Sequence, residues 1–125
     1  MLFQHYVLLI LVESNILRRM NRIPQEKIAS ASEGLRAIAH EVRLSVLCHL
    51  LNGPMCVQEL MEATGAAQSN LSQHLAKMRM MGVICNEKRG QQVYYSISNP
   101  AFADLVHALQ HIYCPERCSI KGRPE

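Results

Sequence analysis

The stretch from Gly65 to Gly82, GAAQSNLSQHLAKMRMMG, constrains the fold more than any other part of the chain. Leu71, Leu75 and Met78 recur at i, i+4 and i+7, which is the one-sided apolar stripe of a helix that packs on a core. The opposite face has hydroxyl, amide, imidazole and ammonium groups but no carboxylate, on Ser69, Asn70, Ser72, Gln73, His74 and Lys77. Such a face suits a helix that reads base edges on a polyanion, but a solvated helix surface would have the same spacing.

Length and composition favour one globular domain. The 125 residues are enough for a single hydrophobic core, and 49% hydrophobic against 18% charged residues excludes a disordered chain. The formal net charge is only +3, so nucleic-acid binding has to be judged from where the cations lie. Trp is absent, and Phe and Tyr are few, which leaves little material for stacking on unpaired bases. Duplex is therefore the better nucleic-acid partner.

Helical patterns precede the Gly65–Gly82 stretch. The sequence predicts a helix over 25–40, a second helix over 42–51 that is apolar on nearly every side, and a short helix over 55–63. The run Asn52-Gly53-Pro54 ends the second helix, because Gly suits the left-handed residue after a helix and Pro cannot continue one. Thr64-Gly65 then forms a tight turn. Two short helices joined by such a turn are a helix-turn-helix candidate.

After Gly82 the apolar period changes from helical to alternating. Residues 83–85 and 93–97 predict two strands, linked by 86–92 with a turn at its glycine. Lys88 and Arg89 would then lie near the tip of a hairpin, where DNA phosphates could meet them. The order of elements is that of a winged helix-turn-helix, a mainly α fold with a small β-hairpin wing.

A last helix is predicted to begin at Pro100 with Asn99 as its N-cap and to end near Cys114. Its apolar stripe is wide enough to pack against both the core and a partner, and it comprises Phe102, Leu105, Val106, Leu109, Ile112 and Tyr113.

We expect three regions in the chain: an N-terminal extension over 1–24, a DNA-binding and dimerisation domain over 25–114, and a tail over 115–125. The apolar segment Leu2–Val12 is too short to span a bilayer, and its arginines follow it where a secretion signal needs them in front. It is either a helix that packs on the domain or a partner, or sequence upstream of a true start at Met20. Neither membrane association nor export is expected.

Five cysteines are an odd number for a secreted disulfide framework, so reduced thiols and a cytoplasmic location are the simpler interpretation. A thiol-disulfide enzyme built on Cys114 and Cys118 is disfavoured, because the pair lacks the Cys-x-x-Cys spacing and the βαβ setting. The expected partner is duplex DNA, without a cofactor. The residues expected to contact it are Gln68, Ser69, Asn70, Ser72, Gln73, His74, Lys77, Lys88, Arg89 and Gln91.

Three runs of sequence, LRAIAHEVRLSVLCHLLNG, VQELMEATGAAQSNLSQHLAKMRMMGVI and QQVYYSIS, resemble the ArsR/SmtB family of bacterial repressors over residues 35–114. The resemblance implies a homodimer built from the first and last helices, with two recognition helices on a palindromic operator. It also implies repression that an inducer relieves. Such an inducer must bind or modify one dimer conformation differently from the other.

The metal-sensing branches of this family match incompletely. Arsenic-sensing members look like ELCVCDLC at the start of the short helix, where this chain retains only Cys56, and one thiolate cannot build that site. Zinc-sensing members place Asp and His differently in the last helix. His107, His111 and Cys114 nevertheless share one flank of that helix at i, i+4 and i+7, and could ligate zinc with one further donor. Zinc-responsive repression therefore stays as the alternative function.

The dithiol branch that senses reactive sulfur species, the SqrR, BigR and HlyU type, matches better. Its members look like ILCxL in the second helix and YC or FC at the end of the last, and this chain has Val46-Leu47-Cys48-His49-Leu50 and Ile112-Tyr113-Cys114. The resemblance implies that Cys48 and Cys114 are regulatory thiols, and that their oxidation or crosslinking releases the repressor. Peroxide could act on the same thiols, and Cys118 could compete as the resolving thiol.

Overall fold

The computed structural model describes residues 4–7, 9 and 22–114. The tail over 115–125, its Cys118, and most of the N-terminal extension lie outside the described residues. The chain divides into two units, Met1–Ser32 and Glu33–Glu125. In the first, residues 4–7 and 9 are helical and helix α2 (Gln25–Ile38) begins. No helix within the described ranges is long and apolar enough to cross a membrane.

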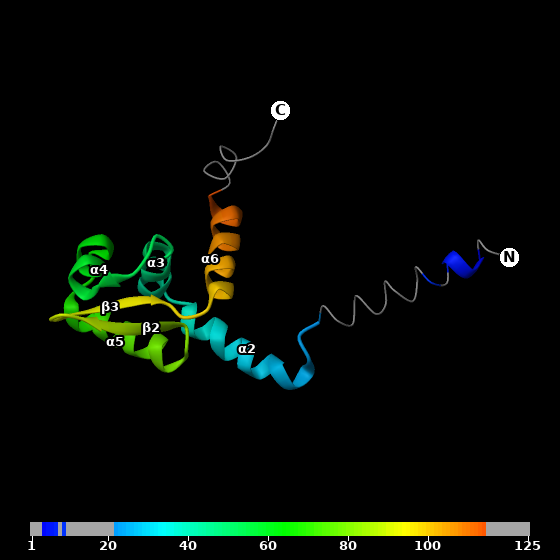
Figure 1. Ribbon diagram of the computed structural model, residues 1–125, viewed down its shortest axis with the longest axis horizontal. Coiled ribbons are helices and arrows are strands. Elements are labelled where there is room, and N and C mark those ends of the chain that lie inside the picture. Colours follow the sequence, from blue (N-terminus) through cyan, green and yellow to red (C-terminus); the bar gives the residue numbers. More distant parts are fainter. Residues whose placement is uncertain (1–3, 8, 10–21, 115–125) are drawn as a thin grey trace, which may run out of the picture. The chain divides into compact units, whose positions relative to one another are not determined.

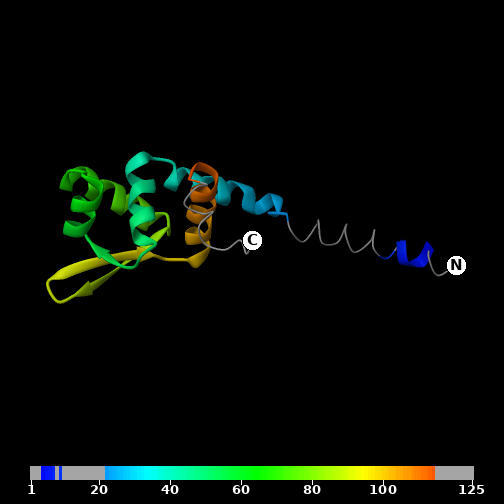
Figure 2. The same cartoon turned by 90° about the horizontal axis from the view of Figure 1, so that it is seen from above.

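The second unit has the predicted order of helices and a hairpin (Figure 1). After the end of α2 come α3 (Glu41–Leu50), β1 (Met55–Cys56), α4 (Val57–Thr64), α5 (Gln68–Met80), β2 (Ile84–Arg89), β3 (Gln92–Ile97) and α6 (Pro100–Tyr113). α4 and α5 form the helix-turn-helix, and β2 and β3 project from the helices as a wing (Figure 2). The mainly α winged helix-turn-helix predicted from the sequence is thus confirmed.

The sheet differs from the prediction in two respects. It has three antiparallel strands in the order β1-β3-β2, because Met55 and Cys56 pair with Tyr95 and Tyr94 instead of starting the short helix. Two residues are too few to show a strand period, so β1 could not be predicted from its own residues. The predicted linker over 86–92 is also wrong, since β2 continues to Arg89, which pairs with Gln92.

The core lies between α3, α4, α5, β2 and α6. The apolar stripe predicted for α5 is confirmed, with Leu71, Leu75 and Met78 all buried. The other buried hydrophobic residues of this core are Ala37, Ile38, Val46, Leu47, Leu50, Leu60, Val83, Ile84 and Val106. Packing of α5 on this core turns its polar face outward.

Local signals fix where the helices of the second unit begin and end. Gly65, at φ +72°, ends α4 in the left-handed conformation that glycine adopts without strain. Asn99 caps α6 by accepting a hydrogen bond from the Ala101 amide at 2.9 Å, and Pro100 is the first helical residue, both as predicted. His40 caps α3, because its Nδ1 accepts from the Val42 amide at 3.1 Å.

Candidate DNA interface and thiol cavity

The outward face of α5 is polar over most of its length, although Met80 at its end is 81% exposed. Six of its predicted DNA-contacting residues are exposed, and they are Gln68, Ser69, Asn70, Ser72, Gln73 and Lys77. His74 is half-buried. The helix contains no acidic residue, and no side chain among the described residues caps its N-terminus at Ala67. The first amides of α5 are therefore free to donate to an anion.

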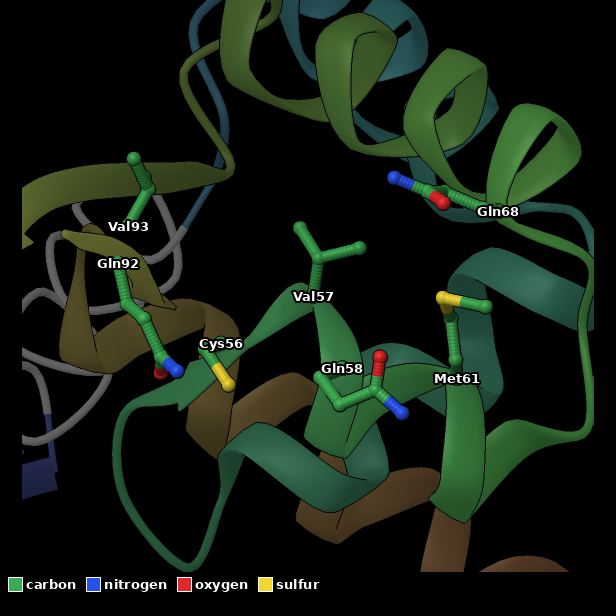
Figure 3. A pocket seen from close by; sticks show the side chains of 7 residues that line it. All are labelled: Cys56, Val57, Gln58, Met61, Gln68, Gln92 and Val93. Atoms are coloured by element: carbon green, nitrogen blue, oxygen red, sulfur yellow. The ribbon is translucent and has the colours of Figure 1, made fainter.

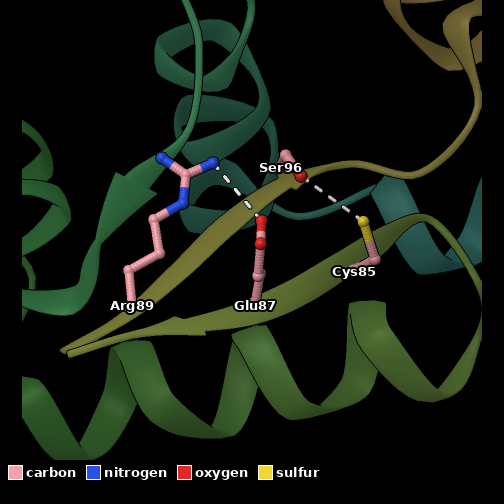
Figure 4. Close-up of polar contacts among 4 residues, drawn as sticks. All are labelled: Cys85, Glu87, Arg89 and Ser96. Carbon is pink, nitrogen blue, oxygen red and sulfur yellow. Dashed lines mark hydrogen bonds and ion pairs between the residues drawn. The ribbon is translucent and has the colours of Figure 1, made fainter. Parts of the chain in front are cut away.

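The wing holds the remaining predicted contacts, and Lys88, Arg89 and Gln91 are all exposed there. Arg89 is already engaged, since it pairs with Glu87 at 3.3 Å (Figure 4). Its guanidinium carbon also lies 5.1 Å from the centre of the Tyr94 ring. An exposed pair of this kind contributes little energy, so a phosphate could displace Glu87.

A pocket of about 300 Å³ separates the helix-turn-helix from the wing (Figure 3). It brings together residues of β1, α4, the start of α5 and β3, namely Cys56, Val57, Gln58, Met61, Gln68, Gln92 and Val93. Cys56 is buried and donates to Oε1 of Glu59 at 3.4 Å. This pocket therefore offers side-chain amides, one thiol and the Met61 thioether.

A second cavity, of about 230 Å³, lies between α3 and α6. Its lining is almost entirely apolar and contains both predicted regulatory thiols, and it comprises Leu44, Cys48, Val106, Leu109, Gln110, Tyr113 and Cys114. Cys48 is half-buried and Cys114 is exposed. Burial, and to a lesser extent the negative charge of a Cys114 thiolate, raises the pKa of Cys48. Two thiols far apart in the sequence thus lie at one cavity, close enough to influence each other.

The zinc alternative gains no comparable geometry. Within residues 4–7, 9 and 22–114, no group of three or more His, Cys, Asp or Glu side chains is placed to hold a metal ion. His107, His111 and Cys114 are all exposed on α6, and Nδ1 of His107 lies 3.1 Å from Oε1 of Gln110. The predicted zinc donors are therefore not gathered within the described part of the chain.

A cationic cluster that the sequence did not indicate lies where α3 meets α5. Arg43 is only 6% exposed, and its Nε and Nη1 have no hydrogen-bond partner in the described part of the chain. The rings of His40 and His74 lie 4.1 Å apart between centroids. Partial burial, followed by the charges of His40, Arg43 and Lys77, lowers the pKa of His74. The sequence offered one signal, an arginine within α3, a helix that is apolar on nearly every side.

The chain matches known regulators over most of this second unit. Residues 40–85 match the family described as bacterial regulatory protein, arsR family. The HTH-type transcriptional regulator YgaV of Escherichia coli K12 is 38% identical over 92 residues, which cover 73% of this chain and 93% of YgaV. The chain belongs to the arsR family. Like YgaV, it is a transcriptional regulator and not an enzyme, as the sequence predicted.

Two further relatives support the same assignment for this arsR-family regulator. The transcriptional activator HlyU of Vibrio cholerae is 38% identical over 76% of this chain and 89% of HlyU. The crystal structure of the transcriptional repressor BigR from Xylella fastidiosa superposes with a TM-score of 0.68 at 31% identity, over 72% of this chain and 92% of BigR. The relatives thus include both an activator and a repressor.

Proposed function

We propose that this arsR-family regulator binds operator DNA as a homodimeric repressor and is released when reactive sulfur species crosslink Cys48 and Cys114. One observation carries the proposal: both thiols line the same apolar cavity between α3 and α6. A crosslink can form only between sulfurs that can approach each other, and no other cavity described above contains two cysteines.

The proposed DNA contacts rest on α5 and the wing. α5 presents amide and hydroxyl groups suited to base edges, Lys77 for phosphates, and free amides at its N-terminus. Lys88 and Arg89 add cations on the wing. Because α5 has no acidic residue, its exposed face suits contact with a polyanion better than ordinary exposure to solvent.

The proposed dimer rests on large apolar side chains left exposed in the second unit. Ile112 is 66% and Tyr113 is 79% exposed, although both belong to the apolar stripe of α6. Leu35, near the end of α2, is 56% exposed. A second copy of the chain would cover such side chains, because homodimer interfaces are more apolar than ordinary protein surface.

The proposed sensing chemistry proceeds in two steps. The Cys114 thiolate, on the exposed side of the cavity, attacks the outer sulfur of a hydropersulfide and takes it up as Cys114–S–SH, while a thiolate leaves. The Cys48 thiol then loses its proton to solvent and attacks the Cys114 sulfur, and hydrosulfide leaves. Two thiols are oxidised to a disulfide by two electrons, and one sulfane sulfur is reduced to sulfide.

A bond between these sulfurs would change the packing of α6 on α3. A disulfide holds its two Cα atoms about 4.4–6.8 Å apart, which constrains how α3 and α6 can pack around the cavity. Since the proposed dimer interface includes α6, its movement alters the spacing of the two α5 helices on the operator. Mismatch to the operator then releases the repressor, because the modification favours one dimer conformation.

Peptide mapping after treatment with polysulfide tests the proposal, combined with fluorescence anisotropy on a duplex carrying the upstream region of the gene. We expect one Cys48–Cys114 crosslink and loss of DNA binding, both unchanged in Cys85→Ser, which removes the exposed wing thiol that lies 3.4 Å from Ser96. Cys48→Ser should bind DNA normally but resist release. A crosslink between Cys114 and Cys118, or release by stoichiometric zinc without polysulfide, would refute it.

A further inference from the structure

Arg43 occupies an unusual position for a charged residue. It belongs to α3, whose other buried residues include the core residues Val46 and Leu47, and it is only 6% exposed. Guanidinium groups stay protonated in proteins, so this is a permanent buried charge. Its Nε–H and Nη1–H meet no acceptor among the described residues. A buried charge without a partner is strongly destabilising, which points to an anion that is absent from the free chain.

No side chain of the described unit acts as that anion. The ion pairs of the described residues join Arg36 to Glu33 and Arg89 to Glu87, so Arg43 is in neither. Around it are further cationic or protonatable groups. The ring centroids of His40 and His74 lie 4.1 Å apart, and the charge of Lys77 contributes to lowering the pKa of His74. An oxyanion is the ligand that such a cluster would take.

We propose that His40, Arg43, His74 and Lys77 form a binding site for one phosphate of the DNA backbone. This inference rests on the proposed DNA-binding function. The site continues the polar face of α5, where Lys77 is exposed and His74 is half-buried. Lys77 and the histidines donate to the phosphate oxygens, and the fixed charge of Arg43 attracts the phosphate from its buried position on α3. The phosphate in turn compensates the buried guanidinium.

The site links DNA binding to proton uptake. In the free chain, burial and the charges of His40, Arg43 and Lys77 hold the pKa of His74 below its ordinary value, which favours the neutral ring. α4 and β2 also pack on α5, but no charged group of either element is among those that shift the pKa of His74. A bound phosphate favours the imidazolium and raises this pKa. The added affinity is therefore complete below the free-state pKa and is lost as pH rises through the bound-state pKa.

Salt titrations of DNA binding test the site, with a labelled duplex of random sequence, since phosphate contacts act on any duplex. Arg43→Met keeps the side-chain volume and removes the charge. We expect it to bind roughly tenfold more weakly and to lower the slope of log affinity against log salt by about one. Its thermal stability should not fall, because an unpaired buried charge is gone. The matched control is Arg36→Met, which removes an exposed cation from α2 and should keep the wild-type slope.

Two outcomes would overturn the site. An unchanged slope in Arg43→Met refutes it while leaving DNA binding itself intact, whereas a wild-type chain that binds no duplex at low salt refutes the proposed function as well. Should Arg43→Met not fold, His74→Gln and His40→Asn decide, the latter retaining a cap for α3. We expect His74→Gln to reduce the weakening of DNA binding as the pH rises through the bound-state pKa of His74, and retention of the wild-type pH profile would refute the site.

Discussion

Helix α3 has two sides that contrast in packing. On one side are Leu47, which is 0% exposed in the core, and Arg43, whose charge helps to lower the pKa of His74 on α5. Toward α6 its side chains are Leu44 and Cys48, which are half-buried and line a cavity of about 230 Å³. α3 is therefore closely packed on the side of α5 and loosely packed against α6, the helix that ends just before Cys114.

The contrast shows how one small domain could separate sensing from DNA contact. A closely packed interface resists small displacements, because side chains have no free volume to move into. A cavity lets two sulfurs approach without first breaking the core. Since α3 belongs to both sides, a change in how α6 packs on it reaches α5 through a rigid element, which is the physical requirement for coupling two sites.

Paired truncations on α3 test this contrast most strongly. Leu47→Ala should lower the free energy of unfolding by about 3 kcal/mol, since it leaves a hole in a packed core. Leu44→Ala, three residues earlier, should lower it by only about 1 kcal/mol, because its side chain already borders empty space. Urea unfolding at one fixed protein concentration gives both values. Equal losses would mean that the two sides of α3 are packed alike.

The pH dependence of Cys48 alkylation by iodoacetamide tests burial at the cavity. The raised pKa keeps this thiol protonated at neutral pH, so its reaction rate should increase about tenfold per pH unit until the pKa is passed. In Cys114→Ser the pKa of Cys48 should fall only partly, because burial is the larger cause. A return to the ordinary thiol value in that variant would assign the shift to the neighbouring charge instead.

Much of the fold could be predicted because its signals are local. The apolar stripe of α5, the cap at Asn99 and the turn at Gly65 each depend on residues within a few positions of one another. β1 and the true length of β2 could not be predicted in this way. Both are set by backbone pairing with β3, which no pattern within a single short segment records.

The candidate sites divide in the same manner. The polar face of α5 follows from helical spacing alone, and the resemblance to a dithiol branch indicated Cys48 and Cys114. The cavity between them depends on side chains from two helices that the sequence cannot position. Arg43 was missed because its meaning comes from burial: an exposed arginine at the same place would be an ordinary surface cation.

The α5 side can be sharpened by comparing two of its neighbouring residues. Lys77→Ala should weaken binding to every duplex about fivefold and reduce its salt dependence, since an ammonium contacts phosphates. Gln73→Ala should act mainly on the preferred sequence and relax base preference at one position. Anisotropy titrations on operator and random duplexes separate the two effects. Identical losses on both duplexes for both variants would exclude direct base readout by α5.

The smallest effect is expected at the far end of the loosely packed side, where Asn99 caps α6. Asn99→Ala should lower the free energy of unfolding by about 1 kcal/mol, because the Ala101 amide loses its acceptor, while Asn99→Asp should retain the cap. Cys114 follows the opposite end of this 14-residue helix, so its crosslinking to Cys48 should keep the wild-type rate. If Asn99→Ala also changed that rate, α6 would respond as a whole to loosening at its start, and the cavity would depend on the anchoring of the entire helix and not only on the residues that line it.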